Sequence, residues 1–382
     1  MKKLLWMMAA AMLAGSASAA RSVVFGVEAF NRSVPATSDK TTVFSPVGFE
    51  LDAAIMADAF DPIVKAHFTE TLGTLTGIDG TYVPMLNALR NGATNRMEYV
   101  SARAFLVPDF RKVSAAYAQE LQRNYMAEIC LLFPKAGAEC WFRNMMDGNM
   151  EDFELPIGTS KAERNSFYEL VSMRASWQDP FPMANTRKMG FFLTPNGDRK
   201  NRQTVDMMCD VRKMDLCEYG DWTLGRIPMT DGAWFYAVLP KGKNELPAVR
   251  AKITEKNIEE LLAVMGSITE PNVYHGPAVV CVPKMELTSD VDLADAMGHF
   301  KFPSKGYLRL NNELAGKDFR QVARFKLDEQ GLDPKPVLEK RPEDQIKATA
   351  GIKALMLNRP FIFWVYHEPT KSILIMGQYT GR

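Results

Sequence analysis

The sequence predicts an α+β protein with large, mainly antiparallel β-sheets. Three observations indicate this fold class. Helical and strand-like segments alternate irregularly along the chain, the run AWFYAVLP at 233–240 is apolar at successive positions, and two strand-like runs close the chain around Pro369. A strand that is apolar on both faces is typical of the middle of a sheet covered on both sides. No repeat or low-complexity linker marks a domain boundary.

Helices are expected where a capping residue precedes a proline or an amphipathic segment. Ser45 stands before Pro46, and Asp61 stands before Pro62, so each pair offers an N-cap and a proline in the first turn. Apolar residues then recur on one face of the helix that begins at Ser45. Two more amphipathic helices are expected, at 113–128 and 254–265.

Strands are expected where β-branched and aromatic residues gather between turn signals. The expected strands are Tyr99–Val107, Ile129–Phe133, Phe167–Trp177, Met189–Thr194, Thr204–Cys209, Ala233–Leu239, Val279–Leu287, Val322–Gln330 and a terminal hairpin from Arg359. Residues 331–358 carry no obvious helix of their own. A connection of that length inside a compact domain is usually functional or disordered.

Residues 1–20 have the features of a secretory signal. Lys2 and Lys3 form a charged start, 4–13 form an apolar run, and Ala17-Ser18-Ala19 is a cleavage pattern. The apolar run is too short to span a bilayer, and no later stretch is long and apolar enough. We therefore expect the remaining chain to be exported, to the periplasm or the extracellular space, without a membrane partner.

Composition argues against several classes of function. Hydrophobic residues make up 47% of the chain, which suffices for a large core, and 46 basic residues balance 45 acidic ones without a basic run. Nucleic acid is therefore not an expected partner. The five cysteines leave their pairing open. Cys130 with Cys140, or Cys209 with Cys217, lie near enough in sequence to bridge, and free buried thiols are an equal alternative.

The chain carries no recognisable catalytic or metal-binding motif. None of its four histidines is three or four residues from another, so no helix offers a paired-imidazole metal site. The patterns C-x-x-C, G-x-S-x-G, G-x-G-x-x-G and G-x-x-x-x-G-K-[ST] are absent. The sequence therefore predicts a protein that is not a catalyst and that needs no metal or cofactor.

Six segments, taken in order, carry a resemblance to a known family. They are VFSPVGFELDAAIMADAF at 43–60, FYELVSMRASWQDPF at 167–181, TRKMGFFLTPNGDRKNRQTVDMM at 186–208, AWFYAVLPKGKNEL at 233–246, AVVCVPKMELTSDVDLADAMG at 278–298 and RPFIFWVYHEPTKSILIMGQYTG at 359–381. Together they resemble the serpin family, in the family's own order. The resemblance implies one domain over 21–382, with three mainly antiparallel sheets, about eight or nine helices and an exposed reactive-centre loop at about 331–353.

The resemblance also implies a mechanism and a partner. In inhibitory serpins a target protease attacks the loop and forms an acyl-enzyme, and the cut loop then enters the main sheet as a new central strand and distorts the protease. The implied partner is a serine or cysteine endopeptidase, and the implied state is a monomer. Counting forward from the hinge and back from the terminal hairpin brackets the scissile bond. The candidates are Gln345, Ile346, Lys347, Ala348 and Thr349.

The hinge of this loop departs from the pattern of inhibitory members. Its approach fits the family at Glu329, Gln330 and Gly331, but a small hydroxyl residue and a run of alanines would be expected next. The residues present instead are Leu332, Asp333, Pro334, Lys335 and Pro336. Proline lacks the N–H that a central strand needs. We therefore expect slow insertion, so that the protein behaves as a substrate, with both lost donors facing one neighbouring strand.

A second departure lies in the region where the sheet must part. Ser45 matches the family's motif, as does Trp177 at the end of its strand. The residues that differ are Gly48 where a second serine is expected, Glu169 where an asparagine is expected and Gln321 where a histidine is expected. A polar cluster of Ser45, Glu169 and Gln321 is expected, acting either as an altered latch or as simple packing.

Two functions remain in competition on the sequence alone. The first is a covalent inhibitor that traps an endopeptidase through cleavage of the loop. The alternative is a serpin-fold binding protein without inhibitory activity, or a plain protease substrate, which the hinge prolines favour.

Overall fold

The structure is a computed structural model of the chain. It describes residues 23–37, 39–60, 62–63, 65–66, 82–91, 97–156, 165–194, 200–243, 245–253, 255–302, 307–310, 314–332 and 352–382. The expected leader at 1–20, the hinge residues from Asp333 to Pro336 and the scissile candidates at 345–349 lie outside these residues.

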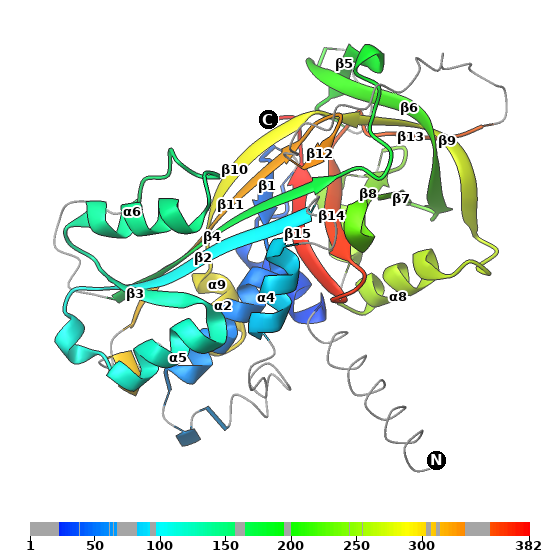
Figure 1. The fold of residues 1–382 in the computed structure, drawn as a ribbon. Helices are drawn as coiled ribbons and strands as arrows, with labels where there is room; N and C mark the ends of the chain where they lie inside the picture. The colour runs from blue at the N-terminus through cyan, green and yellow to red at the C-terminus, as the bar shows by residue number, and fades with distance from the viewer. Residues whose placement is uncertain are drawn as a thin grey trace, which may run out of the picture.

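A six-stranded sheet is the first of two sheets among the described residues (Figure 1). Its strands run in the order β10, β11, β4, β2, β3, and a short β12 pairs with β4. The neighbours β11 and β4 are parallel, whereas β2 is antiparallel to β4. The bounds are β2 Met97–Val107, β3 Ala127–Leu131, β4 Asn165–Ser176, β10 Met285–Asp292, β11 Leu314–Leu327 and β12 Gly331–Leu332.

A nine-stranded sheet lies beside it, in the order β1, β15, β14, β8, β7, β6, β9, β13, with β5 paired to β6. The apolar strand β8 is central there, as its sequence predicts. Three sheets are expected, whereas the described residues form two hydrogen-bonded sheets. The reason is that β6 pairs with β5, β7 and β9 in one continuous sheet. The bounds are β1 Thr42–Phe44, β5 Thr186–Phe192, β6 Arg202–Glu218, β7 Trp222–Pro228, β8 Ala233–Pro240, β9 Val273–Pro283, β13 Lys353–Met356, β14 Phe361–His367 and β15 Ser372–Tyr379.

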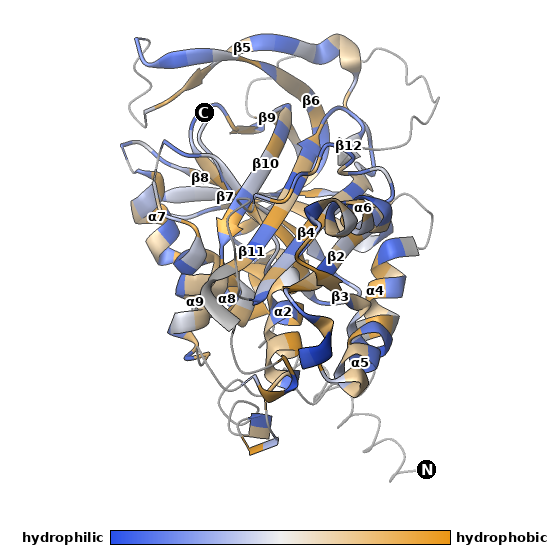
Figure 2. Ribbon diagram, turned by 90° about the vertical axis from the view of Figure 1, so that its left-hand side faces the viewer, coloured by the Kyte–Doolittle hydropathy of each residue, from blue (hydrophilic) through white to orange (hydrophobic). Residues whose placement is uncertain are grey.

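Helices cover both faces of the six-stranded sheet. The α-helices are one at 23–33, α2 Pro46–Asp58, α4 Tyr82–Asn91, α5 Ala115–Tyr125, α6 Lys135–Met145, α7 Leu246–Lys252, α8 Glu255–Gly266 and α9 Ala294–His299. Short 3-10 turns are η2 Phe110–Lys112, η3 Met183–Asn185, η4 Thr230–Gly232 and η5 Leu308–Leu310. Phe142 of α6 packs with Leu170 on one face of β4, and α2 packs with Val171 on the other face. Figure 1 shows α6 above these strands and α2 below them, and Figure 2 again shows α2 below the strands.

α2 differs from the amphipathic helix that the sequence predicts. Ser45 caps it as expected, accepting a hydrogen bond from the Gly48 amide at 3.1 Å, and Pro46 occupies the first turn. All thirteen of its residues are buried, including Glu50, Asp52 and Asp58. The polar side of α2 therefore faces protein, and its charged groups need partners inside the molecule.

Two further sequence expectations need correction. The single strand expected at 279–287 is two strands, β9 and β10, because the chain passes from one sheet to the other at Lys284. Neither sequence-near cysteine pair forms. Cys209 of β6 instead bonds to Cys281 of β9, directly opposite it in the sheet with Cα atoms 4.3 Å apart. The thiols of Cys130, Cys140 and Cys217 are free.

Candidate functional site

The segment after β11 folds back as a tight hairpin. Asp328 and Gly331 exchange backbone hydrogen bonds, at 3.3 and 3.1 Å, so that Glu329 and Gln330 form a two-residue turn. The Asp328 carboxylate accepts from the amides of Gln330 and Gly331 at 2.8 and 3.2 Å. Such local bonds explain why aspartate is common in turns. The first residues of the expected hinge, Glu329 to Gly331, therefore form a turn directly after β11.

β12 occupies the junction between β4 and β11. It pairs antiparallel with β4, with Leu332 opposite Ala175. At Ala175, the opposite edge of β4 pairs with β2. β12 therefore lies on the same edge of β4 that pairs with β11 nearer the start of β4. β4 and β11 pair directly only as far as Ser172 and Arg324. The hinge therefore forms the first two residues of a strand between β4 and β11 (Figure 1).

Glycine is required at position 331. Its φ of 129° lies in the region that residues with a side chain rarely adopt. A Cβ added there would lie 2.3 Å from the Ala175 carbonyl oxygen and 2.6 Å from the Ser176 Cα. The close approach of the hinge to the backbone of β4 depends on this glycine.

An ion pair between buried Glu329 and the exposed Lys284 holds the turn. The Glu329 side chain accepts from the Thr186 hydroxyl at 2.7 Å, and its Oε2 lies 2.9 Å from Lys284 Nζ. Although burial acts to raise the pKa of Glu329, the hydrogen bonds from Lys284 and Thr186 lower it below its ordinary value. The same hydrogen bond raises the pKa of Lys284. Both groups are therefore charged near neutral pH, and they tie the turn to the passage between β9 and β10.

Trp177 supports the turn from the end of β4. Its backbone N–H donates to the Gln330 carbonyl at 2.7 Å, and its indole Nε1 donates to the Asp328 carbonyl at 2.9 Å. Its ring packs edge-on against Phe181 and Phe235. Trp177 thus belongs to the hinge rather than to the polar cluster around Ser45.

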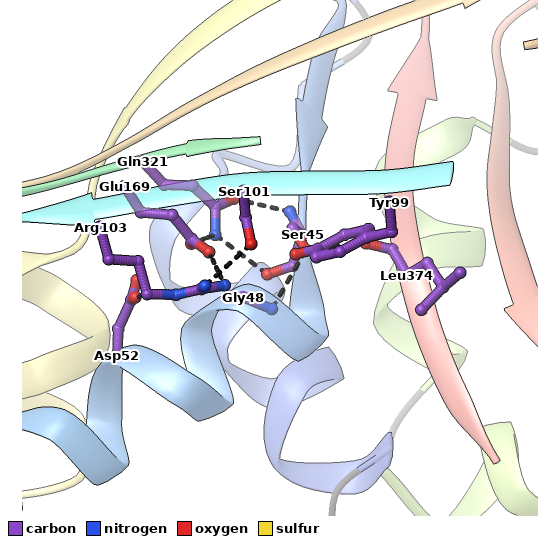
Figure 3. A network of polar contacts seen from close by, with 9 residues as sticks. All are labelled: Ser45, Gly48, Asp52, Tyr99, Ser101, Arg103, Glu169, Gln321 and Leu374. Atoms are coloured by element: carbon purple, nitrogen blue, oxygen red, sulfur yellow. Dashed lines mark hydrogen bonds and ion pairs between the residues drawn. The ribbon is translucent and has the colours of Figure 1, made fainter. Parts of the chain in front are cut away.

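The structure brings Ser45, Gly48, Glu169 and Gln321 together beneath the sheet (Figure 3). Gln321 of β11 donates to Glu169 of β4 at 2.7 Å, and the two residues are directly opposite in the parallel pair. The same amide group accepts from the Ser45 backbone N–H at 2.6 Å and donates to the Ser45 carbonyl at 3.0 Å. The Gln321 side chain therefore connects β4 and β11 to the N-terminus of α2.

Three members of this cluster are not identified by the sequence alone. Tyr99 of β2 shares a 2.8 Å hydrogen bond with the Ser45 hydroxyl. Arg103, also of β2, donates to Glu169 at 2.5 Å, and Asp52 of α2 lies 3.2 Å from Arg103 Nε. Burial, ahead of the Glu169 charge, raises the pKa of Tyr99, so that its hydroxyl stays neutral. The cluster is a buried ionic network around a hydrogen-bonded core.

Gly48 and Glu169 fit one another. A Cβ at position 48 would lie 2.4 Å from Glu169 Oε2 and 2.5 Å from Glu169 Oε1. The glutamate carboxylate therefore occupies the space into which a side chain on residue 48 would extend. The two departures from the expected pattern, at positions 48 and 169, belong to one altered packing arrangement.

The described residues show no group of three or more His, Cys, Asp or Glu side chains placed to hold a metal ion. Within the same part of the chain, no helix has the length and apolar character needed to cross a membrane.

The family model "Serpin (serine protease inhibitor)" matches residues 20–381. The chain belongs to the serpin family. Plasminogen activator inhibitor 1 of Mus musculus is 22% identical over 395 aligned residues, which cover 95% of this chain and 92% of that protein. Serpins are mostly protease inhibitors rather than catalysts.

Solved serpin structures show the same fold. Native protease nexin-1 with heparin superimposes with a TM-score of 0.78 at 16% identity, covering 96% of this chain and 99% of that one. Human thyroxine-binding globulin complexed with thyroxine gives a TM-score of 0.75 at 17% identity, covering 95% of this chain and 98% of that one. The predicted α+β serpin fold is confirmed.

Proposed function

We propose that this serpin inhibits a serine or cysteine endopeptidase by inserting its cleaved loop between β4 and β11. The loop spans about 331–353, and the protease cleaves it among residues 345–349. The seating of β12 between these two strands is the observation that carries the proposal. The first residues of the loop are already in register with β4, so insertion extends an existing strand and needs no new nucleus.

Insertion is favourable because the loop gains hydrogen bonds to two neighbouring strands. Each ladder bond contributes about 1 kcal/mol net, so a dozen of them supply on the order of 10 kcal/mol. Before cleavage the loop is fixed at both ends, by β12 and by β13, which pairs with β9. Cleavage frees one end, and the uncleaved form is then held by a kinetic barrier.

The register of β12 identifies the strand that the hinge prolines affect. The Trp177 N–H donates to the Gln330 carbonyl, so this opposite pair is of the hydrogen-bonded type. Such pairs alternate along an antiparallel ladder. Continued insertion in this register would place Pro334 opposite Met173, in another pair of that type. Pro336 would follow one repeat later, and both rings would lack the N–H that β4 needs.

Two carbonyl groups of β4 would then lack their donors, at a cost of about 1–3 kcal/mol each. This cost is smaller than the total gain but falls on the first residues to enter. Asp333 would lie opposite Arg174, a favourable pairing of charges. We therefore propose an inhibitor whose cleaved loop enters the sheet slowly at first and then inserts completely.

The second candidate is a serpin that proteases cleave without being trapped, or one that only binds a partner. The proline register favours it, because slow entry leaves the acyl-enzyme time to hydrolyse. A protein of the same fold, thyroxine-binding globulin, is named for binding thyroxine. The two candidates differ in the fate of the protease.

The deciding experiment incubates the full chain with trypsin-like, elastase-like, subtilisin-like and papain-like proteases. A protease–serpin complex that survives denaturing electrophoresis supports inhibition. Cleavage within 345–349 without any such complex contradicts it. The variant Pro156→Ala, in an exposed connection away from the hinge, is a matched control for proline variants in the loop.

The proposal includes export, with removal of the leader at residues 1–20. The Cys209–Cys281 bond supports it, because disulfides persist mainly in oxidising compartments. Amino-terminal sequencing of the protein recovered outside the cytoplasm tests this step. A retained leader, or thiols at 209 and 281 in freshly isolated protein, would contradict it.

A further inference from the structure

Two carboxyl groups share one guanidinium between α2 and the six-stranded sheet (Figure 3). Arg103 donates to Glu169 at 2.5 Å, and its Nε lies 3.2 Å from Asp52 Oδ1. All three side chains are at most 1% exposed. Among the described residues, Arg103 is the one cation in contact with either carboxyl group. If both carboxyl groups were ionised, one negative charge would be buried without compensation.

A buried uncompensated charge is strongly unfavourable, so one of the two carboxyl groups keeps a proton at neutral pH. The hydrogen bonds show which one. Glu169 accepts from Arg103 through Oε1 and from Gln321 through Oε2, so each of its oxygens already has a hydrogen-bond donor. Neither oxygen of Asp52 accepts a hydrogen bond. Burial first, and then the charge of Glu169, raise the pKa of Asp52 well above its ordinary value.

We propose that Asp52 holds a proton beside ionised Glu169, and that loss of this proton in alkaline solution loosens the β4–β11 junction and speeds opening of the sheet. The second half of this inference rests on the proposed function. The link is direct, because Glu169 is also the acceptor for Gln321 across the two strands that part. A second negative charge on Asp52 would repel Glu169 and compete with it for Arg103.

The other groups around Asp52 do not titrate in the same range. β2 presents Tyr99 and Arg103. Burial raises the pKa of the Tyr99 phenol. Burial acts to lower the pKa of the Arg103 guanidinium, but the neighbouring charges, that of Glu169 first, outweigh burial and leave this pKa raised. β11 presents the uncharged Gln321, and β15 presents the Leu374 carbonyl to Ser45. On α2, the other two acidic residues lie two and six positions away, off the helix face that carries Asp52.

The test compares wild-type protein with Asp52→Asn, which cannot ionise but retains an N–H donor. The folded state binds the Asp52 proton more tightly than the unfolded chain, so the wild type loses stability as the pH rises above about 4. The unfolding equilibrium constant should rise by up to about tenfold per pH unit from this one proton. Urea unfolding between pH 5 and 10 measures the slope, and Asp52→Asn should lack this contribution.

Asp152→Asn is the matched control, because Asp152 is 73% exposed and pairs with Arg324 on the same sheet. It should keep the wild-type slope. An Asp52→Asn variant with the wild-type slope would overturn the shared proton. If that variant folds poorly, infrared spectra of wild-type protein provide an independent reading. A protonated carboxyl band at pH 7 that disappears in alkaline solution supports the inference, and its absence at pH 7 contradicts it.

A kinetic measurement tests the link to loop insertion. After cleavage within the loop, the rate at which the protein reaches its stabilised form should increase with pH in the wild type but not in Asp52→Asn. Equal pH profiles for the two proteins would refute this link. If cleaved wild-type protein gains no stability at any pH, the proposed function fails together with the link, whereas the unfolding slopes still decide on the proton.

Discussion

The Glu169 carboxylate fills the space that a side chain on residue 48 would occupy, since an added Cβ there would lie 2.4 Å from Glu169 Oε2. Gly48 lies in the first turn of α2, and Glu169 lies on β4, one of the two strands that part in the proposed mechanism. The pair therefore connects the packing of a buried helix to the charge network of the sheet. Substitutions at the two positions should not act independently.

Gly48→Ala should lower the free energy of unfolding by about 1–3 kcal/mol, because the added methyl group overpacks the site. The penalty should be smaller in a Glu169→Ala background, where the carboxylate is gone and Arg103 keeps Asp52 as its partner. Urea unfolding of the four proteins in a double-mutant cycle measures this coupling.

The control for this cycle is Gly137→Ala in α6, where an added Cβ meets nothing within 4 Å. A helical glycine with open space around it should gain about 0.5–1 kcal/mol on becoming alanine. A Gly48→Ala penalty that is unchanged by Glu169→Ala would show that the two residues are not coupled.

The ion pair at the hinge gives an acid-sensitive contact. The pKa of Glu329 is lower in the folded protein, so its contribution to stability is present above the ordinary glutamate pKa and is lost as the pH falls through the folded value. Below about pH 4 the turn should loosen. Hydrogen exchange at the Trp177 and Phe181 amides, which donate to Gln330 and Glu329 carbonyls, reports this opening.

Glu329→Gln should reproduce the acid effect at neutral pH, with faster exchange at these two amides. Glu368→Gln, at an exposed surface ion pair with Lys371, is the control and should leave them unchanged. Unaltered protection in Glu329→Gln would mean that the backbone hydrogen bonds alone hold the turn.

The disulfide between β6 and β9 closes a long segment of chain, since its cysteines are 72 residues apart in sequence. Replacing both with serine should lower the free energy of unfolding by about 2–4 kcal/mol, mainly by releasing the unfolded chain. Cys217→Ser, on the same strand but with a free thiol, is the comparison. Denaturant unfolding of the three proteins measures the effect, and equal midpoints would contradict it.

Local signals were sufficient for much of the fold but not for the ionic network. The Ser45–Pro46 cap and the doubly covered β8 follow from neighbouring residues, and both are confirmed. The passage between β9 and β10 was missed because both strands are rich in strand-forming residues up to and beyond Pro283. Sequence patterns describe one element at a time, and this break depends on which sheet each half joins.

The missed residues Asp52 and Arg103 show the same limit. A charged residue on a predicted amphipathic helix is assigned to the solvent side. Since α2 is buried on every side, Asp52 faces β2 and β4 instead. Nothing near Arg103 in the sequence indicates that it is its partner, because the contact joins residues from separate elements. The unusual Glu169 was the one available signal, since a buried carboxylate requires a cation.

The hinge prolines provide the last prediction. Pro334→Ala together with Pro336→Ala should restore two N–H donors opposite β4, so loop-cleaved protein should gain about 2–6 kcal/mol more stability than the cleaved wild type. The same double variant should convert more of the encounters with a target protease into stable complexes, because entry begins faster. Thermal unfolding of cleaved and uncleaved forms, with Pro156→Ala as the control, measures the gain. An equally large gain in the wild type would show that the prolines do not oppose the ladder. The register set by Gly331 and Leu332 would then have to change beyond β12.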